Sequence, residues 1–310
     1  ISATIVFTTI NARGVKLGAQ WQKIFTIGSI LVILLYIVVG FSSSKGSWLN
    51  LQAVPLDFSR ISIPDLGQAL IGIYFTYSGW TILAYIAGEI KDPRRNIPLA
   101  SFSGVSTVVI LYFLMNVVYM LALPVSEMTG IVDIGYQALR MLWRPEVSFA
   151  FTFIILIAII STLNSTVLSG ARITYAMGRD DRFFRPFGQL HPVHQTPARA
   201  LWLQAGWTII LILLATFDQL LTYTVFVMLP FGFLSAVSLI LFRYKEKSSE
   251  SAYPAWGYPV TSFIYIVFTL FIMVNTLLNQ PLETLSGIMA VLVGLPFYYY
   301  FIKRYRMSGK

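Results

Sequence analysis

The sequence predicts an all-α protein that crosses a membrane many times. Hydrophobic residues make up 56% of the chain and charged residues only 11%, whereas about a quarter of the residues in a typical soluble domain are charged. The mean hydropathy is +0.72. Apolar runs of roughly 18–25 residues recur along the chain, and an α-helix needs this length to cross about 30 Å of hydrocarbon. These observations indicate a polytopic membrane protein.

Eight of these runs are expected to be complete helical spans. Their limits are 24–41, 66–88, 104–123, 147–171, 200–217, 219–242, 260–278 and 285–302. A further apolar segment, Ile1–Ile10, has about half the length of a crossing. Because the chain begins there without a Met, we interpret it as truncated, with one or more spans missing upstream.

Two long connections join these spans. Residues 42–65 are rich in Ser and contain two prolines. Residues 124–146 include the stretch SEMTGIVDIGYQALRMLW, in which apolar residues recur intermittently. A helix with one apolar face often lies in the membrane interface. We therefore expect a short helix in this second connection.

The charges of the loops predict how the chain is oriented. When loops are taken alternately, one side holds 18 of the 22 Lys and Arg residues and 6 of the 13 Asp and Glu residues. The segments on that side are 11–23, 89–96, 172–199, 243–250 and 303–310. Cytoplasmic loops carry an excess of Lys and Arg. We expect these loops and the C-terminus in the cytoplasm, with the chain in the plasma membrane (the inner membrane of a bacterium).

The composition excludes several classes of function. The chain has no Cys, and His191 and His194 have no carboxylate cluster near them in the sequence, so we expect no metal site. The predicted spans contain no Asp, Glu, His, Lys or Arg, which argues against an intramembrane enzyme and against a chain of buried proton carriers. The net charge of +9 is concentrated in the loops, so no nucleic acid partner is expected.

The span 66–88 contains an unusual midpoint, Tyr77-Ser78-Gly79. Backbone at membrane depth leaves the helix only where it is buried in protein or lines a cavity, and such breaks mark the binding sites of transporters. A break here would expose N–H groups and a positive helix end to a carboxylate. Gly and Ser also occur in membrane helices because they allow close packing, and the residues leave both interpretations open.

The span 147–171 holds a second unusual feature, five polar side chains within the six positions from Ser161 to Thr166. Polar groups in a span usually face a cavity, and hydroxyl and carbonyl oxygens suit a hard cation. The same side chains can instead bond to carbonyls one turn back in their own helix. Both interpretations remain open.

Three stretches resemble a known family. FTYSGWTILAYIAGEIKDPRRNIPLA resembles the sixth helix and following loop of the amino acid–polyamine–organocation transporters, especially the L-type amino acid transporter branch. NARGVKLGAQWQKIFT is similar to the start of that family's fifth helix. TLNSTVLSGARITYAMGRDDRFFRPFGQLHPVHQTP is similar to the eighth helix and its cytoplasmic loop. The stretches occur in the family's order, and the similarity extends over nearly the whole chain.

The resemblance implies a LeuT-like fold of two inverted five-helix repeats followed by two further helices. Residues 1–65 would then end the first repeat, with Ile1–Ile10 as the tail of the fourth helix. Residues 66–243 would form the second repeat, and residues 244–310 the two extra helices and a cytoplasmic tail. The first helix, which binds the substrate together with the sixth in this family, would lie upstream of residue 1.

The resemblance also implies a substrate-binding site. Its aromatic gate would be Phe75, its unwound backbone Tyr77-Ser78-Gly79, and its eighth-helix contact Asn164. The full set is Phe75, Tyr77, Ser78, Gly79, Trp80, Thr81 and Asn164. Thr81 departs from the family because L-type members often have Asn there, which leaves the specificity for the substrate's side chain open.

A second departure concerns a coupling ion. Ser29 stands where many relatives have a lysine whose ammonium replaces a sodium ion. Without that charge the cavity is open to a real cation, Na⁺ in particular. The candidate ligands are Ser29, Ser161, Thr162 and Ser165. An uncoupled exchanger and a proton-coupled carrier are the alternatives, and no other cofactor is expected.

The cytoplasmic motif after the sixth helix suggests an inner gate. Glu89, Arg94 and Arg95 match the family's Glu…Asn-Pro-x-Arg pattern, with Asp92 in place of Asn. They are expected to close the inner side by ion pairs, although a solvated helix end would have the same composition.

The sequence therefore predicts a secondary transporter of amino acids that works by alternating access. Neutral substrates are favoured because the predicted spans offer no buried acid. The alternatives are a carrier or exchanger of cationic amino acids or polyamines, and a non-transporting membrane subunit. The expected partners are the amino acid and the lipid bilayer, and the residues leave the oligomeric state and any accessory subunit open.

Overall fold

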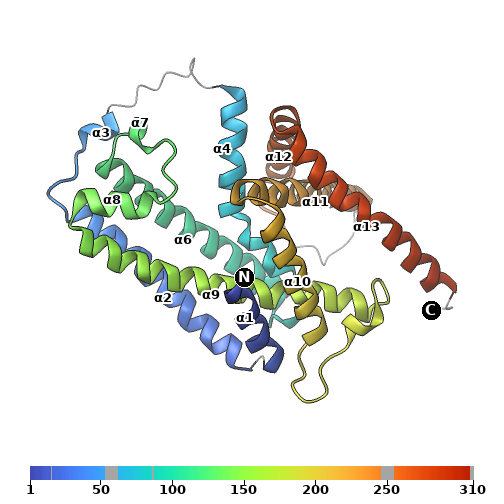
Figure 1. Ribbon diagram of the computed structural model, residues 1–310. Helices are drawn as coiled ribbons and strands as arrows, with labels where there is room; N and C mark the ends of the chain where they lie inside the picture. Colours follow the sequence, from blue (N-terminus) through green and yellow to red (C-terminus); the bar gives the residue numbers. More distant parts are fainter. Residues whose placement is uncertain (15, 53–61, 86, 246–254, 308–310) are drawn as a thin grey trace. The chain divides into compact units, whose positions relative to one another are not determined.

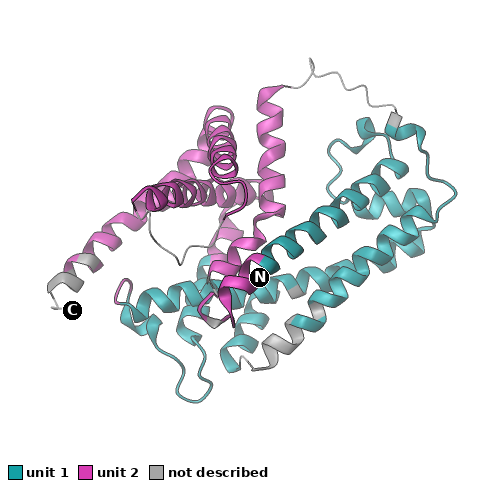
Figure 2. Cartoon of the chain, turned by 180° about the vertical axis from the view of Figure 1, so that it is seen from behind, with its two compact units in different colours: residues 1–57, 99–180, 184–207 teal, residues 58–98, 181–183, 208–310 magenta. Residues whose placement is uncertain are grey.

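The structure is a computed structural model that describes residues 1–14, 16–52, 62–85, 87–245 and 255–307, and these are mostly helical (Figure 1). No strand occurs in those ranges. The chain forms two compact units, coloured in Figure 2. Unit 1 comprises residues 1–57, 99–180 and 184–207, and unit 2 comprises residues 58–98, 181–183 and 208–310. The all-α fold predicted from the apolar runs is confirmed.

Unit 1 is built around one long helix, α9 (Pro145–Arg179), against which α1 (Ser2–Arg13), α2 (Lys16–Phe41) and α8 (Ile134–Leu142) pack. The unit also contains most of α6 (Pro93–Ala122) and the start of α10 (Ala198–Leu214). Its short helices are α3 (Leu49–Gln52), α7 (Val125–Met128) and the 3₁₀ turn η4 (Arg185–Gly188).

Unit 2 contains three long helices that pack on one another. They are α11 (Phe217–Lys245), α12 (Val260–Asn279) and α13 (Pro281–Met307). The helix α4 (Ile63–Thr76) contacts both α11 and α12. Ile71, Val225, Leu229 and Ile272 form the apolar core of this unit.

The helix ends follow the charge and proline preferences of helices. α4 has Pro64 and Asp65 in its first turn, and α9 begins at Pro145 followed by Glu146. Proline suits the first helical positions because its missing N–H would have no partner there, and a carboxylate interacts favourably with the positive helix end. Arg179 lies in the last turn of α9, where the helix end is negative.

The structure tests the eight predicted spans by length. Among the described residues, five helices are long and apolar enough to cross a membrane, and they correspond to the predicted spans 104–123, 147–171, 219–242, 260–278 and 285–302. The predicted span 24–41 lies within α2, which has 26 residues, and the predicted span 200–217 falls largely on α10, which has 17 residues. The eighth predicted span, 66–88, is interrupted, as described below.

The short helix predicted in residues 124–146 is confirmed as α8. Its buried face, Ala138, Leu139 and Leu142, packs against Tyr36 of α2 and Val118 of α6. Hydrogen bonds hold it in place: the Tyr36 hydroxyl donates to the Gly135 carbonyl at 2.7 Å, and the Trp143 indole N–H donates to the Val39 carbonyl at 2.9 Å. The helix therefore ties together α2, α6 and α9.

The predicted repeat boundaries at residues 65 and 243 concern internal symmetry along the chain. The two compact units are assembled from several separate segments each, so they do not coincide with those repeats. The division into repeats stays a prediction.

Candidate functional site

The helix is interrupted where the sequence predicted a break. The α-helix α4 ends at Thr76, Tyr77 has φ −100° and ψ 4°, and Ser78–Thr81 form the 3₁₀ turn η2. Two short turns follow, α5 (Ile82–Tyr85) and η3 (Ala87–Glu89). Between Tyr77 and Glu89 the described residues therefore form separate short turns rather than one continuous helix.

Hydroxyl groups bond to backbone carbonyls on both sides of this break. Thr76 Oγ1 donates to the Ile73 carbonyl at 2.8 Å, Ser78 Oγ to the Phe75 carbonyl at 2.7 Å, and Thr81 Oγ1 to the Ser78 carbonyl at 3.0 Å. Ser and Thr side chains compete for carbonyls in this way and bend or end helices. The break is thus encoded locally by the sequence Phe-Thr-Tyr-Ser-Gly-Trp-Thr.

Gly79 does not serve close packing within the described part of the chain. A Cβ built on it would meet no atom within 4 Å. By contrast, a Cβ on Gly67 in the same segment would collide with the side chain of Asn275. Of the two interpretations of Tyr77-Ser78-Gly79, the structure favours an interrupted helix beside open space over a tight helix–helix contact.

A cavity of ≈ 620 Å³ lies beside the turns that follow the break. Trp80, Thr81 and Ala84 line it from η2 and α5, and the remaining wall comes from Tyr74, α11 and α12. Phe75, Tyr77, Ser78 and Gly79 are not among its lining residues. The structure therefore brings Trp80 and Thr81 together in one cavity and separates them from the other predicted residues of this segment.

Asn164 has a partner that sequence reasoning missed. Its Oδ1 accepts a hydrogen bond from Nδ2 of Asn11 at 2.8 Å, and both side chains are buried. The pair joins α1 to α9 next to the cluster formed by Ala12, Val167 and Ala171. Asn164 lies in unit 1, and residues 75–81 lie in unit 2, so its predicted contact with the substrate stays a prediction.

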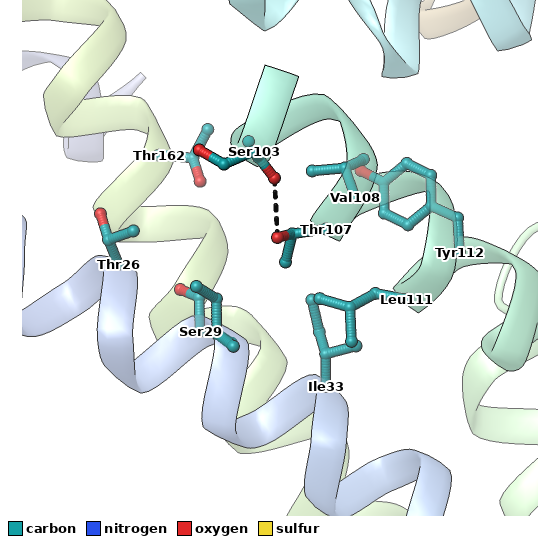
Figure 3. A pocket seen from close by; sticks show the side chains of 11 residues that line it. Thr26, Ser29, Ile33, Ser103, Thr107, Val108, Leu111, Tyr112 and Thr162 are labelled. Atoms are coloured by element: carbon teal, nitrogen blue, oxygen red, sulfur yellow. Dashed lines mark hydrogen bonds between the residues drawn. The ribbon is translucent and has the colours of Figure 1, made fainter. Parts of the chain in front are cut away.

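A second cavity, of ≈ 430 Å³, lies in unit 1 between α2, α6 and α9 (Figure 3). It contains two of the predicted ion ligands, Ser29 and Thr162. Four more hydroxyl side chains line it that the sequence did not reveal, those of Thr26, Ser103, Thr107 and Tyr112. Figure 3 shows these side chains projecting from their three helices. Residues 26 and 29 are three positions apart, and residues 103 and 107 are four apart, so each pair lies on one face of its helix. This spacing was the feature of the sequence from which the additional hydroxyls could have been found.

The hydroxyls of this cavity also bond within their own helices. Ser103 Oγ donates to the Leu99 carbonyl at 2.7 Å, Thr107 Oγ1 to the Ser103 carbonyl at 2.8 Å, and Thr162 Oγ1 to the Ala158 carbonyl at 3.1 Å. Each bond uses the hydroxyl hydrogen and leaves oxygen lone pairs available. The sequence left two alternatives open, hydroxyls that bond to carbonyls of their own helix and hydroxyls that face a cavity. In this part of the structure both occur together.

Of the two other predicted ion ligands, Ser161 and Ser165, only Ser165 has a described side chain. The side chain of Ser161 lies outside the described residues, and Ser165 is half-buried but does not line the cavity. The oxygens that do line it are neutral hydroxyls, which are hard ligands. No carboxylate lines this cavity, and the coupling ion stays a prediction.

The predicted inner gate lies at the start of α6. Arg94 and Arg95 are exposed there, and the side chain of Glu89 lies outside the described residues. The Asp92 carbonyl accepts the N–H groups of Arg95 and Asn96, each at 3.0 Å, which closes the first turn of the helix. Ion pairs of the gate stay a prediction.

Comparisons with known proteins place the chain among transporters. A family model described as "Amino acid permease" matches residues 1–299. The chain is 29% identical over 310 residues to the serine/threonine exchanger SteT of Bacillus subtilis (strain 168), an alignment that covers 98% of the chain. It is 26% identical to the b(0,+)-type amino acid transporter 1 of Mus musculus over 97% of the chain. It is 25% identical to the large neutral amino acids transporter small subunit 2 of Homo sapiens over 95% of the chain.

These relatives are longer than the chain. The alignments cover 69% of the Bacillus exchanger, 61% of the mouse transporter and 55% of the human small subunit. The similarity therefore reaches across nearly all of this chain but over only about half to two-thirds of each relative.

Proposed function

Because the chain belongs to the amino acid permease family, we propose that it carries neutral amino acids across a membrane by alternating access. The family and the apolar helices make it a multi-pass integral membrane protein rather than an enzyme. The observation that carries the proposal is the helix interrupted at Tyr77, with Gly79 facing open space.

The break offers the groups that an amino acid's main chain requires. At the ends of helices, backbone N–H and carbonyl groups lie outside the regular ladder, and such groups bind a carboxylate and an ammonium group respectively. At this break the Tyr77 N–H donates to the Ile73 carbonyl at 3.2 Å, so a substrate would compete with bonds of this kind. Breaks of this kind near the membrane midplane hold substrates in transporters. We assign the substrate's main chain to Tyr77-Ser78-Gly79 and an aromatic gate to Phe75, which is 43% exposed.

The preference for neutral substrates is supported by the linings of both cavities. No Asp, Glu, His, Lys or Arg side chain lines either of them. A cationic side chain would need a carboxylate, because an uncompensated charge in a region of low dielectric constant is costly. The Bacillus relative carries the words serine/threonine exchanger in its name and the human relative the words large neutral amino acids, which agrees with this class of substrate.

We further assign the basic loops and the C-terminus to the cytoplasmic side of the plasma membrane. Support comes from the distribution of Lys and Arg, 18 of 22 of which lie on one side of the predicted topology. On this assignment Arg94 and Arg95 lie at the inner end of the transport path, where they would pair with Glu89 when the path is closed.

Uptake into proteoliposomes tests the function directly. Radiolabelled serine, leucine and arginine are offered separately to vesicles that contain the purified protein and an internal pool of the same unlabelled amino acid. We expect saturable uptake of serine or leucine at a rate at least about tenfold above that of arginine, since burying an unpaired charge costs more than the 1.4 kcal/mol that a tenfold ratio represents.

The same experiment separates the alternatives. Faster uptake of arginine than of the neutral amino acids would establish the cationic carrier instead. A monodisperse, folded protein that takes up none of the three would establish the non-transporting subunit. Vesicles without protein provide the background rate.

The hydroxyl cavity of unit 1 favours coupling to a monovalent cation, and we propose Na⁺. Ser29 stands where many relatives of this type have a lysine, and it lines the cavity with Thr162. If Na⁺ occupies this place, the ammonium of a Ser29→Lys variant should replace it. We expect the variant to keep uptake but to lose its stimulation by a sodium gradient, which is measured with and without sodium in the external buffer.

A lysine just beyond the end of the same helix is the matched control for this experiment. Ser42 directly follows α2, and its hydroxyl donates to the Val39 carbonyl at 2.9 Å, outside the cavity. Ser42→Lys should retain the sodium dependence. If uptake by the unaltered protein does not depend on sodium, Na⁺ is ruled out as the coupling ion and an uncoupled exchanger remains. Stimulation by a proton gradient alone would also rule out Na⁺.

A further inference from the structure

The cavity beside the break has an aromatic and uncharged lining. Four aromatic rings face it, those of Tyr74, Trp80, Phe231 and Tyr265, and none of its lining residues carries a charge. Its volume of ≈ 620 Å³ lies within the range of about 300–1,000 Å³ that is typical of sites for small organic molecules. An amino acid's ammonium and carboxylate would find no ionic partner among these side chains.

Three hydroxyls in the cavity wall are placed to act as acceptors. The hydroxyl of Thr81 donates to the Ser78 carbonyl, that of Ser235 to the Phe231 carbonyl at 2.7 Å, and that of Thr261 to the Trp256 carbonyl at 3.2 Å. Since these hydrogens are already used, the oxygens present lone pairs. They would accept a hydrogen bond from a ligand that carries one donor.

Gly232 gives one wall of the cavity its shape. A Cβ at this position would lie 2.5 Å from the Tyr265 hydroxyl oxygen and 3.2 Å from the Tyr74 hydroxyl oxygen. Those two hydroxyls are 3.4 Å apart and share a hydrogen bond. The glycine thus allows the hydroxyls of two tyrosines, from α4 and α12, to meet beside α11. Their rings give this wall aromatic surface against which another ring can pack.

From these features we propose that the cavity between α4, η2–α5, α11 and α12 is a second binding site, for an uncharged aromatic molecule that carries one hydrogen-bond donor. Indoles and phenols have this chemistry. The site goes beyond the proposed transport of amino acids, because its ligand lacks the main-chain charges that the helix break would bind. A bound ring would contact Trp80 and Thr81 after the break and, at the same time, the helices α11 and α12.

Binding of 5-fluoroindole to the purified protein tests this site without any measurement of transport. Fluorine NMR distinguishes ligand bound at a saturable site from ligand dissolved in detergent or lipid. Ser235→Leu should fill the cavity from α11 and weaken binding by at least about tenfold, since the leucine takes the place of the ring and removes an acceptor. Ala84→Leu fills the cavity from α5 and serves as a second variant if Ser235→Leu does not fold.

Ser238→Leu is the matched control on the same helix. Its hydroxyl also donates to the carbonyl four residues earlier, that of Leu234 at 2.6 Å, but Ser238 does not line the cavity. We expect its affinity for 5-fluoroindole to equal that of the unaltered protein. Equal affinity in all variants, or non-saturable uptake like that of protein-free lipid, would overturn the assignment.

Competition with an amino acid completes the test. We expect excess L-serine or L-leucine to leave the bound 5-fluoroindole signal in place. Competitive displacement would show that the ring occupies the amino acid site and would overturn the second site. Because the readout is binding, a protein that binds 5-fluoroindole but transports nothing refutes the proposed transport alone, and one that transports but shows no saturable binding refutes only this site.

Discussion

Gly79→Leu is expected to lower the maximum rate of amino acid uptake by at least about tenfold while the yield and thermal stability of the protein stay unchanged. A Cβ at this position meets no atom within 4 Å, so the leucine has room in the folded protein. The room it occupies lies beside the backbone that we assign to the substrate, where loss of one good set of polar contacts amounts to more than about 1.4 kcal/mol, or tenfold.

Gly72→Leu provides the control for this result. Gly72 lies seven positions earlier, within the regular part of α4, and a Cβ there also meets no atom within 4 Å. The two variants therefore add the same side chain to equally open positions and differ in their relation to the break. Similar uptake by both variants would contradict the assignment of the substrate's main chain to residues 77–79. Equal melting temperatures of the two variants would show that a difference in folding does not affect this comparison.

The second large effect is expected at Gly67, where Gly67→Leu should lower the free energy of unfolding by about 2–4 kcal/mol. A Cβ at this position would collide with the side-chain amide of Asn275 from α12. That amide is buried and donates a hydrogen bond from Nδ2 to the Ile63 carbonyl at 2.7 Å. The leucine must displace Asn275, which strains the contact between α4 and α12 and leaves buried polar groups without partners.

Thermal unfolding in detergent, followed by loss of the monodisperse peak, measures this change. Gly294→Leu on α13 is the control, since a Cβ there meets no atom within 4 Å. We expect a clear decrease in melting temperature for Gly67→Leu and none for Gly294→Leu. Equal melting temperatures would mean that α4 and α12 do not approach each other as closely as the structure shows.

Much of the secondary structure could be predicted because its causes are local. The break follows from Ser78 and Gly79, a hydroxyl that bonds back to a carbonyl next to a residue without a side chain. The helix α8 was predicted from apolar residues that recur intermittently in the connection, and its buried face is made of three of them, Ala138, Leu139 and Leu142. In both places the information lies within a few consecutive residues.

Other features could not be predicted because the spans are apolar on all sides. In such a helix the pattern of residues does not reveal which face meets a neighbour. The sequence therefore pointed to Ser29 and Thr162 but not to Ser103 and Thr107, which line the same cavity from α6. It likewise assigned Asn164 without its partner Asn11, which lies 153 residues away in the chain.

The sequence by itself indicated that this protein spans a membrane, where most of its helices run and which family it resembles, and it left open whether the chain at Tyr77-Ser78-Gly79 is broken or closely packed. Only the tertiary structure decided that Trp80 and Thr81 share an uncharged aromatic cavity with α11 and α12, and that Asn164 bonds to Asn11. The physical reason is the range of the interactions. Hydropathy, capping and breaks depend on neighbours within a turn or two, whereas a cavity is the space left when helices distant in the chain pack side by side.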